Sequence, residues 1–211
     1  GRYAPSSIAA EDKRLWLHLG VDPLAILRAT GQLISSGRII SGASTITMQV
    51  ARLLEPRPRT LWSKLVEMAR AVQLEFTFSK EEILSMYFSL APFGGNVEGA
   101  TAASLIYFNK APARLTVSEA ALLVALPQSP TVSRPDRNPH KATAARNKVL
   151  ERLLVEGLIS EGELNEAKDE TIDGYRHPFP FVAPHLARRL VNQYPQHDAI
   201  HIHIDPEFQK S

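Results

Sequence analysis

The sequence predicts a mainly α-helical protein, on the evidence of its apolar spacing and its helix starts. Apolar residues recur three or four positions apart through most of the chain, which is the period of a helix with one buried face. Three helix starts carry a capping box, in which a Ser or Thr precedes a Glu by three positions. These pairs are Ser79 with Glu82, Thr116 with Glu119, and Ser160 with Glu163. A strand-like alternation occurs only near residues 200–204.

The composition limits the class of protein. A chain of 211 residues is long enough for one sizeable core, or for a main lobe with a smaller appendage. Its formal net charge of +2 gives no sign of nucleic-acid binding, and without cysteine it has neither disulfides nor thiolate chemistry. The longest apolar run, residues 120–126, is far shorter than the roughly 18 residues that span a bilayer. We find no signal-peptide pattern and expect a segment of a longer protein.

Gly, Pro and capping residues divide the first half of the chain into helices. We expect one helix over residues 5–19 and a second from Asp22 to Gly37. A third begins at Ser44 or Thr45 and ends at Glu55, and the prolines that follow exclude a helix over residues 55–60. The next helix has an apolar stripe that comprises Leu61, Leu65, Met68, Ala69, Val72 and Phe76.

The second half begins with the capped helix at Ser79 and a tight loop at residues 91–96. Further helices are expected over residues 99–108, 116–126 and 138–157, with a short one after Ser160. Beyond residue 170, prolines predict an extended connector, then a short basic helix at residues 185–191 and the strand at residues 200–204. A lone strand after helices is typical of the start of another domain. A metal site at His201 and His203 is the alternative, although no carboxylate or cysteine cluster accompanies them.

Residues 42–52, GASTITMQVAR, carry an anion-binding pattern. A helix that begins at Ser44 or Thr45 offers backbone N–H donors, the positive end of its dipole and several hydroxyls together. A phosphate or pyrophosphate is the natural ligand of such a helix end. Gln49 and Arg52 extend the polar face by one turn. The plainer explanation is that Ser and Thr only cap a buried helix.

Glu11 supplies the carboxylate that an anion site would need for catalysis. Taken alone, a Glu on a helix surface usually serves solvation. This sequence, however, has no P-loop, dinucleotide fingerprint or Ser-His-Asp order. A carboxylate near a phosphate site suits a general base that activates an alcohol against a phosphate leaving group. The candidate cations for that leaving group are Arg28, Arg52, Lys64 and Arg70.

Five short patterns stand in order between residues 8 and 156. The first, E-D-x-x-F-x-x-H-x-G, is matched by Glu11, Asp12, His18 and Gly20. The second, G-x-S-T-I-T-Q-Q, is matched at residues 42–49 except for Met48. The third and fourth, R-K-x-x-E and K-x-x-I-L-x-x-Y-L-N, are matched by Lys64 and Glu67 and by Lys80, Ile83, Leu84 and Tyr87. With a fifth at residues 118–127, the chain resembles the family 51 peptidoglycan glycosyltransferase domain of class A penicillin-binding proteins, in its C-type branch.

Three residues depart from the third and fourth patterns. Ser63 stands where the third pattern has Arg, Phe88 where the fourth has Leu, and Ser89 where the fourth has Asn. The missing Arg weakens the set of cations unless Arg59 or Arg70 takes its place.

The resemblance implies a lysozyme-like helical large lobe with a smaller membrane-facing jaw at about residues 24–62. The glycosyltransferase domain would occupy residues 1–169, and residues 170–211 would form a linker and the start of a truncated transpeptidase domain. The implied reaction polymerises lipid II into β-1,4 glycan strands, with inversion and release of undecaprenyl pyrophosphate. It would take place at the periplasmic or extracellular face of the cytoplasmic membrane.

The resemblance also implies the roles of the site residues. Glu11 would be the base, and Glu67 would orient Lys64 or carry a divalent cation. The substrate and pyrophosphate would be bound by Asp12, His18, Arg28, Ser44, Thr45, Gln49, Arg52, Lys64 and Arg70. The sequence itself requires no cofactor and shows no dedicated metal ligands, but Mg²⁺ or Mn²⁺ can assist in this family. The expected partners are lipid II, the growing glycan strand, the membrane surface, the transpeptidase domain of the same chain and the inhibitor moenomycin, with no nucleic acid.

Two other functions stay open. A muramidase of similar fold would use Glu11 as an acid, although hydrolysis commonly needs a second carboxyl across the sugar. A scaffold without activity would bind lipid-linked sugar, with Ser63 and Ser89 as signs of decay. In the jaw, apolar residues alternate with arginines near Trp62, which predicts contact with anionic lipid. The alternative is that these apolar side chains pack inward.

Overall fold

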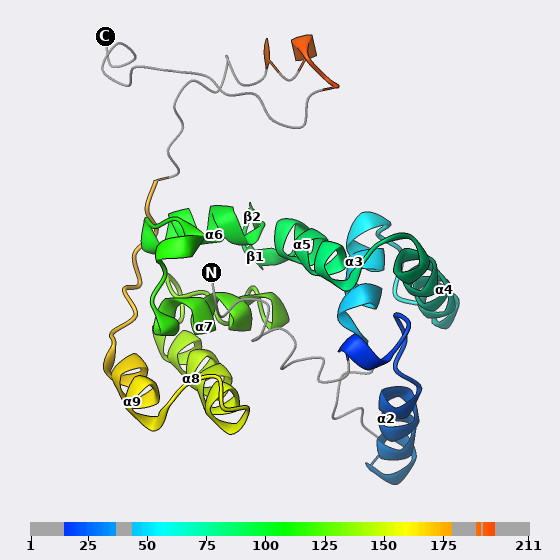
Figure 1. Ribbon diagram of the computed structural model, residues 1–211, viewed down its shortest axis with the longest axis horizontal. Coiled ribbons are helices and arrows are strands. Elements are labelled where there is room, and N and C mark those ends of the chain that lie inside the picture. Colours follow the sequence, from blue (N-terminus) through cyan, green and yellow to red (C-terminus); the bar gives the residue numbers. More distant parts are fainter. Residues whose placement is uncertain (1–14, 37–43, 179–188, 191, 197–211) are drawn as a thin grey trace. The chain divides into compact units, whose positions relative to one another are not determined.

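The computed structural model describes residues 15–36, 44–178, 189–190 and 192–196. The described chain is mainly α-helical, as the sequence predicts, and it divides into two compact units, residues 1–177 and 178–211 (Figure 1). Of the predicted helix at residues 185–191, residues 189 and 190 are described, and both are helical. The predicted strand at residues 200–204 and most of the predicted helix at residues 5–19 lie outside the described residues.

The first described elements are a short 3₁₀ helix, η1 (Leu15–Leu17), and the helix α2 (Pro23–Ser36). Asp22 caps α2 as predicted, because its Oδ1 accepts hydrogen bonds from the backbone N–H groups of Leu24 (3.0 Å) and Ala25 (3.1 Å).

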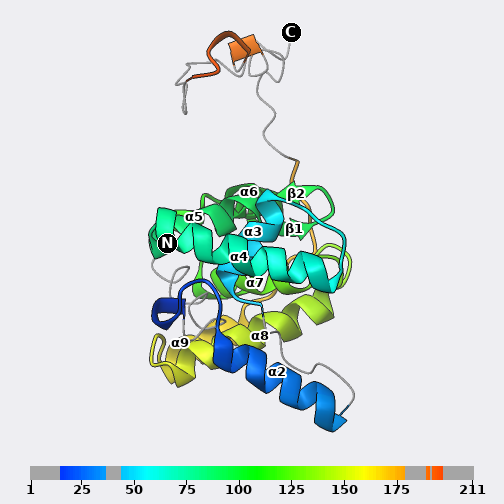
Figure 2. The same cartoon turned by 90° about the vertical axis from the view of Figure 1, so that its right-hand side faces the viewer.

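Three helices follow that meet around α3. They are α3 (Ile46–Leu54), α4 (Leu61–Thr77) and α5 (Lys80–Leu90), and α3 packs against both of the others (Figure 1, Figure 2). Each begins at a residue whose side chain accepts a backbone N–H bond, and the predicted capping box forms at the start of α5. The three N-caps are Thr45, Thr60 and Ser79.

The apolar stripe of α4 does not form its buried face. Leu61, Leu65 and Phe76 are 88%, 57% and 77% exposed, whereas Ser63, Glu67 and Ala71 are buried. The reason is that α3 packs on the face of α4 that carries Lys64 and Glu67, where the polar groups bond to one another. A prediction that the periodic apolar residues mark the core is therefore wrong for this helix.

The second half of the first unit follows its predicted helices closely. The predicted tight loop at residues 91–96 forms part of a small antiparallel hairpin of β1 (Pro92–Gly94) and β2 (Val97–Glu98), with Pro92 opposite Glu98. The remaining elements are α6 (Ala100–Phe108), η2 (Pro112–Arg114), α7 (Val117–Ala125), η3 (Leu126–Gln128), α8 (Pro139–Val155) and α9 (Glu161–Asp169). Both predicted capping boxes in this half, at α7 and α9, are present.

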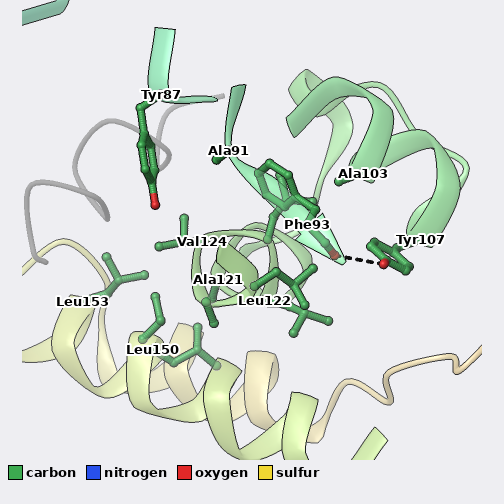
Figure 3. Packing of buried hydrophobic residues seen from close by; sticks show 14 of the residues in the cluster. Tyr87, Ala91, Phe93, Ala103, Tyr107, Ala121, Leu122, Val124, Leu150 and Leu153 are labelled. Carbon is green, nitrogen blue, oxygen red and sulfur yellow. Dashed lines mark hydrogen bonds between the residues drawn. The ribbon is translucent and has the colours of Figure 1, made fainter. Parts of the chain in front are cut away.

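The hydrophobic core is built by η1, α3, α5, the hairpin and the helices α6 to α9. In Figure 3, Leu150 and Leu153 on α8 face the buried side chains of α7, among them Leu122. Phe93 of β1 is also buried there, and its carbonyl oxygen accepts a hydrogen bond from the Tyr107 hydroxyl (3.0 Å). Burial raises the pKa of Tyr107.

The segment after α9 belongs to the first unit as far as residue 177. Arg146 of α8 is 1% exposed and donates hydrogen bonds to the carbonyl oxygens of Lys168 (3.0 Å) and Glu170 (2.6 Å). Farther along, the backbone N–H of His177 donates to the Ile106 carbonyl (2.8 Å). The contacts of Glu170 and His177 lie beyond residue 169. The boundary between a glycosyltransferase domain and a linker stays a prediction.

Candidate functional site

Lys64 lies at the centre of the candidate site, where α4 meets the N-terminus of α3. Its Nζ donates to Ser44 Oγ (2.5 Å) and to Glu67 Oε2 (3.0 Å). The Lys64 side chain is 36% exposed, whereas Glu67 is 10% exposed. A largely buried carboxylate therefore holds an ammonium group that stays open to a ligand from solvent. Three of the predicted site residues are brought together here.

Thr45, and not Ser44, caps α3. Its Oγ1 accepts from the Met48 backbone N–H (3.1 Å) and donates to the carbonyl oxygen of Gly20 (2.5 Å). The sequence alone does not distinguish Ser44 from Thr45 as the N-cap, and the structure gives them different partners. Ser44 meets the lysine from α4, and Thr45 joins α3 to the residues that follow η1.

Gly20 is required where it stands. Its φ of +77° is costly for other residues, and a Cβ there would lie 2.6 Å from the Ala71 carbonyl oxygen. The backbone of the first motif therefore passes close against α4. This explains the glycine of that motif as a packing requirement.

A second polar cluster lies beside the first and was not predicted from the sequence. The Glu75 carboxylate accepts from Thr47 Oγ1 (2.6 Å) and from Lys80 Nζ (2.6 Å to Oε2). Lys80 also donates to the carbonyl oxygen of His18 (2.8 Å). The sequence marks Lys80 only as part of a motif and gives no sign of Glu75, because the partners of Glu75 are five and 28 positions away.

The other predicted binding residues are not joined to Lys64 by any hydrogen bond or ion pair between described residues. Arg28 is exposed on α2, and Arg52 is exposed on α3, two residues from its end. Gln49 is half-buried on α3. Arg70 pairs with Glu55 at 3.3 Å.

The structure does not describe two of the predicted site residues. Glu11 and Asp12 lie outside the described residues. His18, which closes the same motif, is described and buried.

Two of the departures from the motifs, Ser63 and Ser89, have local explanations. Ser63 is buried in the first turn of α4, where its backbone N–H and its hydroxyl bond to Thr60 Oγ1 (3.0 and 2.9 Å). Ser89 is exposed on α5, and its hydroxyl donates to the Ser85 carbonyl (2.8 Å). Both serines are satisfied within their own helices. Neither contributes a charge to the site.

The donors and charges of this site would suit an anion. A helix N-terminus favours negative charge, and the Lys64 ammonium beside it, which is paired with Glu67, offers charged N–H donors. The exposed guanidinium of Arg52 lies on the same helix. This combination suits a phosphate or pyrophosphate group.

Comparison with known proteins gives consistent matches. The family model described as Transglycosylase matches residues 3–154. Penicillin-binding protein 1C of Escherichia coli (strain K12) is 48% identical over 192 residues, which are 91% of this chain and 25% of that protein. Penicillin-binding protein 1A of Aquifex aeolicus (strain VF5) is 40% identical over 166 residues, 78% of this chain and 23% of that protein. The chain thus spans about a quarter of the length of these relatives.

Proposed function

The chain belongs to the transglycosylase family, and from that premise we propose that it is a peptidoglycan glycosyltransferase. It polymerises lipid II into β-1,4 glycan strands, inverts the anomeric centre and releases undecaprenyl pyrophosphate. The observation that carries the proposal is the Lys64 ammonium held between Ser44 and Glu67 at the start of α3.

The leaving group is the pyrophosphate of the donor. As the bond between the anomeric carbon and the pyrophosphate oxygen breaks, negative charge develops on that oxygen. Lys64 and the N-terminus of α3 stabilise this charge without a proton transfer. Glu67 is 10% exposed and holds the ammonium in place, so little reorganisation is needed during the reaction.

The nucleophile is a sugar hydroxyl of the acceptor. Glu11 is proposed as the base that takes its proton, while the oxygen attacks the anomeric carbon from the face opposite the pyrophosphate. The proton passes to Glu11 and the electron pair of the broken bond leaves with the pyrophosphate. General-base assistance of this kind contributes about 10²–10⁴ in rate.

A divalent cation would fit this site best as a companion of the substrate. Among residues 15–36 and 44–178, no three His or acidic side chains gather as a metal site. The Glu67 carboxylate is already engaged by Lys64. Mg²⁺ commonly binds through substrate phosphates and one or two carboxylates, so we propose that Mg²⁺ or Mn²⁺ arrives on the pyrophosphate. There it would neutralise charge on the leaving group.

The membrane is the proposed location of the substrate. No helix in the described part of the chain is long and apolar enough to cross a bilayer. Near the site, however, Trp62 is 72% exposed beside the exposed Leu61, and Leu54 is also exposed. The alternative that the jaw's apolar side chains pack inward is wrong for these three. We propose that they contact the outer leaflet of the cytoplasmic membrane.

One assay separates this proposal from its two rivals. Purified protein is incubated with lipid II, and the products are resolved by size. A glycosyltransferase yields glycan polymer, which muramidase then digests. An enzyme that only shortens preformed glycan would be a muramidase, and a protein that binds lipid II with neither activity would be a scaffold. Either of these results would overturn the proposal.

A further inference from the structure

Glu75 is a buried carboxylate with partners on two other helices. Its side chain is 3% exposed, and it accepts from Thr47 on α3 and from Lys80 on α5. Thr47 is itself fully buried. A buried carboxylate is costly unless it is paired and hydrogen-bonded, and here both conditions are met.

The cluster holds the segment of residues 18–20 from three sides. The Lys80 ammonium of α5 donates to the His18 carbonyl, and Thr45 of α3 donates to the Gly20 carbonyl. On the third side, a Cβ at Gly20 would lie 2.9 Å from Glu75 Cγ of α4. The helices that build the anion site therefore also fix the end of the segment that carries the proposed base.

We propose that Glu75 is a positioning residue for the glycosyl transfer. By orienting Lys80 and bonding to Thr47, it sets the segment of residues 18–20 in register with the N-terminus of α3. The segment continues back to Glu11, seven positions before His18. The inference rests on the proposed function, because it assigns Glu75 to the alignment of the base with the pyrophosphate.

The kinetic consequence is specific. Lys64 bonds to Ser44 and Glu67 and not to Glu75, so we expect a pyrophosphate group to bind when the Glu75 cluster is lost. The rate of transfer should depend on Glu75, because misplacement of a reacting group by about 1 Å can lower the rate roughly 10²-fold. Loss of the cluster should lower kcat and leave KM for lipid II unchanged.

The test removes both charges together. A single substitution at Glu75 or Lys80 would leave the other charge buried and unpaired, whereas an apolar pair is often tolerated in place of a buried ion pair. We expect the double variant Glu75→Met/Lys80→Met to fold, to bind moenomycin like the wild type and to polymerise lipid II with kcat reduced roughly 10²-fold. The matched control is Arg134→Met/Asp136→Met, which removes a similarly buried pair in the loop before α8 and should keep kcat.

The variant Thr47→Val provides a second test that changes no charge. It removes one hydrogen bond to Glu75 and should lower kcat to a smaller extent, again with KM and moenomycin binding unchanged. This variant decides the matter if the double variant does not fold.

Three results would overturn the inference. The first is a folded double variant with the kcat of the wild type. The second is an unfolded double variant together with a Thr47→Val variant that keeps the wild-type kcat. The third is a loss of moenomycin binding in parallel with kcat. The last would show that Glu75 only supports the fold of the site. Failure of the proposed function is a different result, because the wild-type protein itself would then form no polymer.

Discussion

The Lys64 ammonium lies 2.5 Å from the Ser44 hydroxyl oxygen, although the two residues are 20 positions apart in the chain. This contact joins the N-terminus of α3 to the first turns of α4 and brings together two motifs that the sequence shows only separately. Glu67 completes the group from the next turn of α4. The resulting ammonium is oriented and still partly open to solvent.

Lys64→Ala should weaken the binding of pyrophosphate-bearing ligands. The substitution removes a charge-assisted contact worth roughly 1.5–3 kcal/mol, which corresponds to about tenfold or more in the Kd of moenomycin. Arg52→Ala should weaken binding in the same direction. Titration by calorimetry measures both, with Lys168→Ala on α9 as the control. Unchanged affinity in both variants would place the anion site elsewhere.

Anionic vesicles should bind the protein through the jaw. Trp62 and Leu61 are exposed side by side at the start of α4, and each Arg near anionic lipid adds about 1 kcal/mol. Co-sedimentation at low salt should detect binding that falls with added salt, with Trp62→Ala and with Arg57→Glu. Val155→Ala, an exposed apolar residue of α8, is the control. Binding that is indifferent to both jaw substitutions would contradict the assignment.

Arg146 should be needed for the stability of the first unit. It is buried, and desolvation lowers its pKa, an effect that the Glu170 carboxylate partly offsets. Its guanidinium bonds to Ser118 Oγ (3.0 Å) and to two carbonyl oxygens at the end of α9. Arg146→Met leaves these acceptors unsatisfied and should lower the free energy of unfolding by about 3 kcal/mol.

Denaturant titration measures this loss. Arg152→Met, on the exposed face of the same helix, should change little. If the two variants had equal stability, the Arg146 contacts would not stabilise the fold.

The pair of Arg134 and Asp136 should contribute stability that acid removes. The hydrogen bond from Arg134 holds the pKa of Asp136 below its usual value. A carboxyl with a depressed pKa in the folded state stabilises the fold above its unfolded pKa, near 3.8, and loses that contribution as the pH falls through its folded value.

Asp136→Asn should therefore be less stable than the wild type at pH 6, and the difference should shrink below about pH 4. Thermal melting across this range measures the difference. A gap that stayed constant down to pH 2 would show that the pair does not titrate as described.

Local features of the fold were predictable from the sequence and distant ones were not. The capping boxes at Ser79, Thr116 and Ser160 all form, because each depends on residues three positions apart. The buried face of α4 was not predictable. It is set by the packing of α3, which covers a polar face of α4 and not its apolar stripe.

The same distinction applies to the site. The motifs indicated Ser44, Lys64 and Glu67, which the structure brings together. Glu75 carried no local signal, because Thr47, 28 positions away, and the turn into α5 create its environment. Arg28 and Arg70 were proposed from charge alone. The charge of a residue does not indicate whether its side chain reaches the site.

Polymerisation of lipid II by Glu11→Gln tests the central claim most directly. The amide keeps the shape of the carboxylate and loses its basicity, so the variant should bind moenomycin normally while its polymerisation rate falls by about 10²–10⁴. Asp173→Asn, an exposed carboxyl remote in sequence from the motifs, should polymerise at the wild-type rate. A Glu11→Gln variant that forms glycan polymer as fast as the wild type would contradict the account.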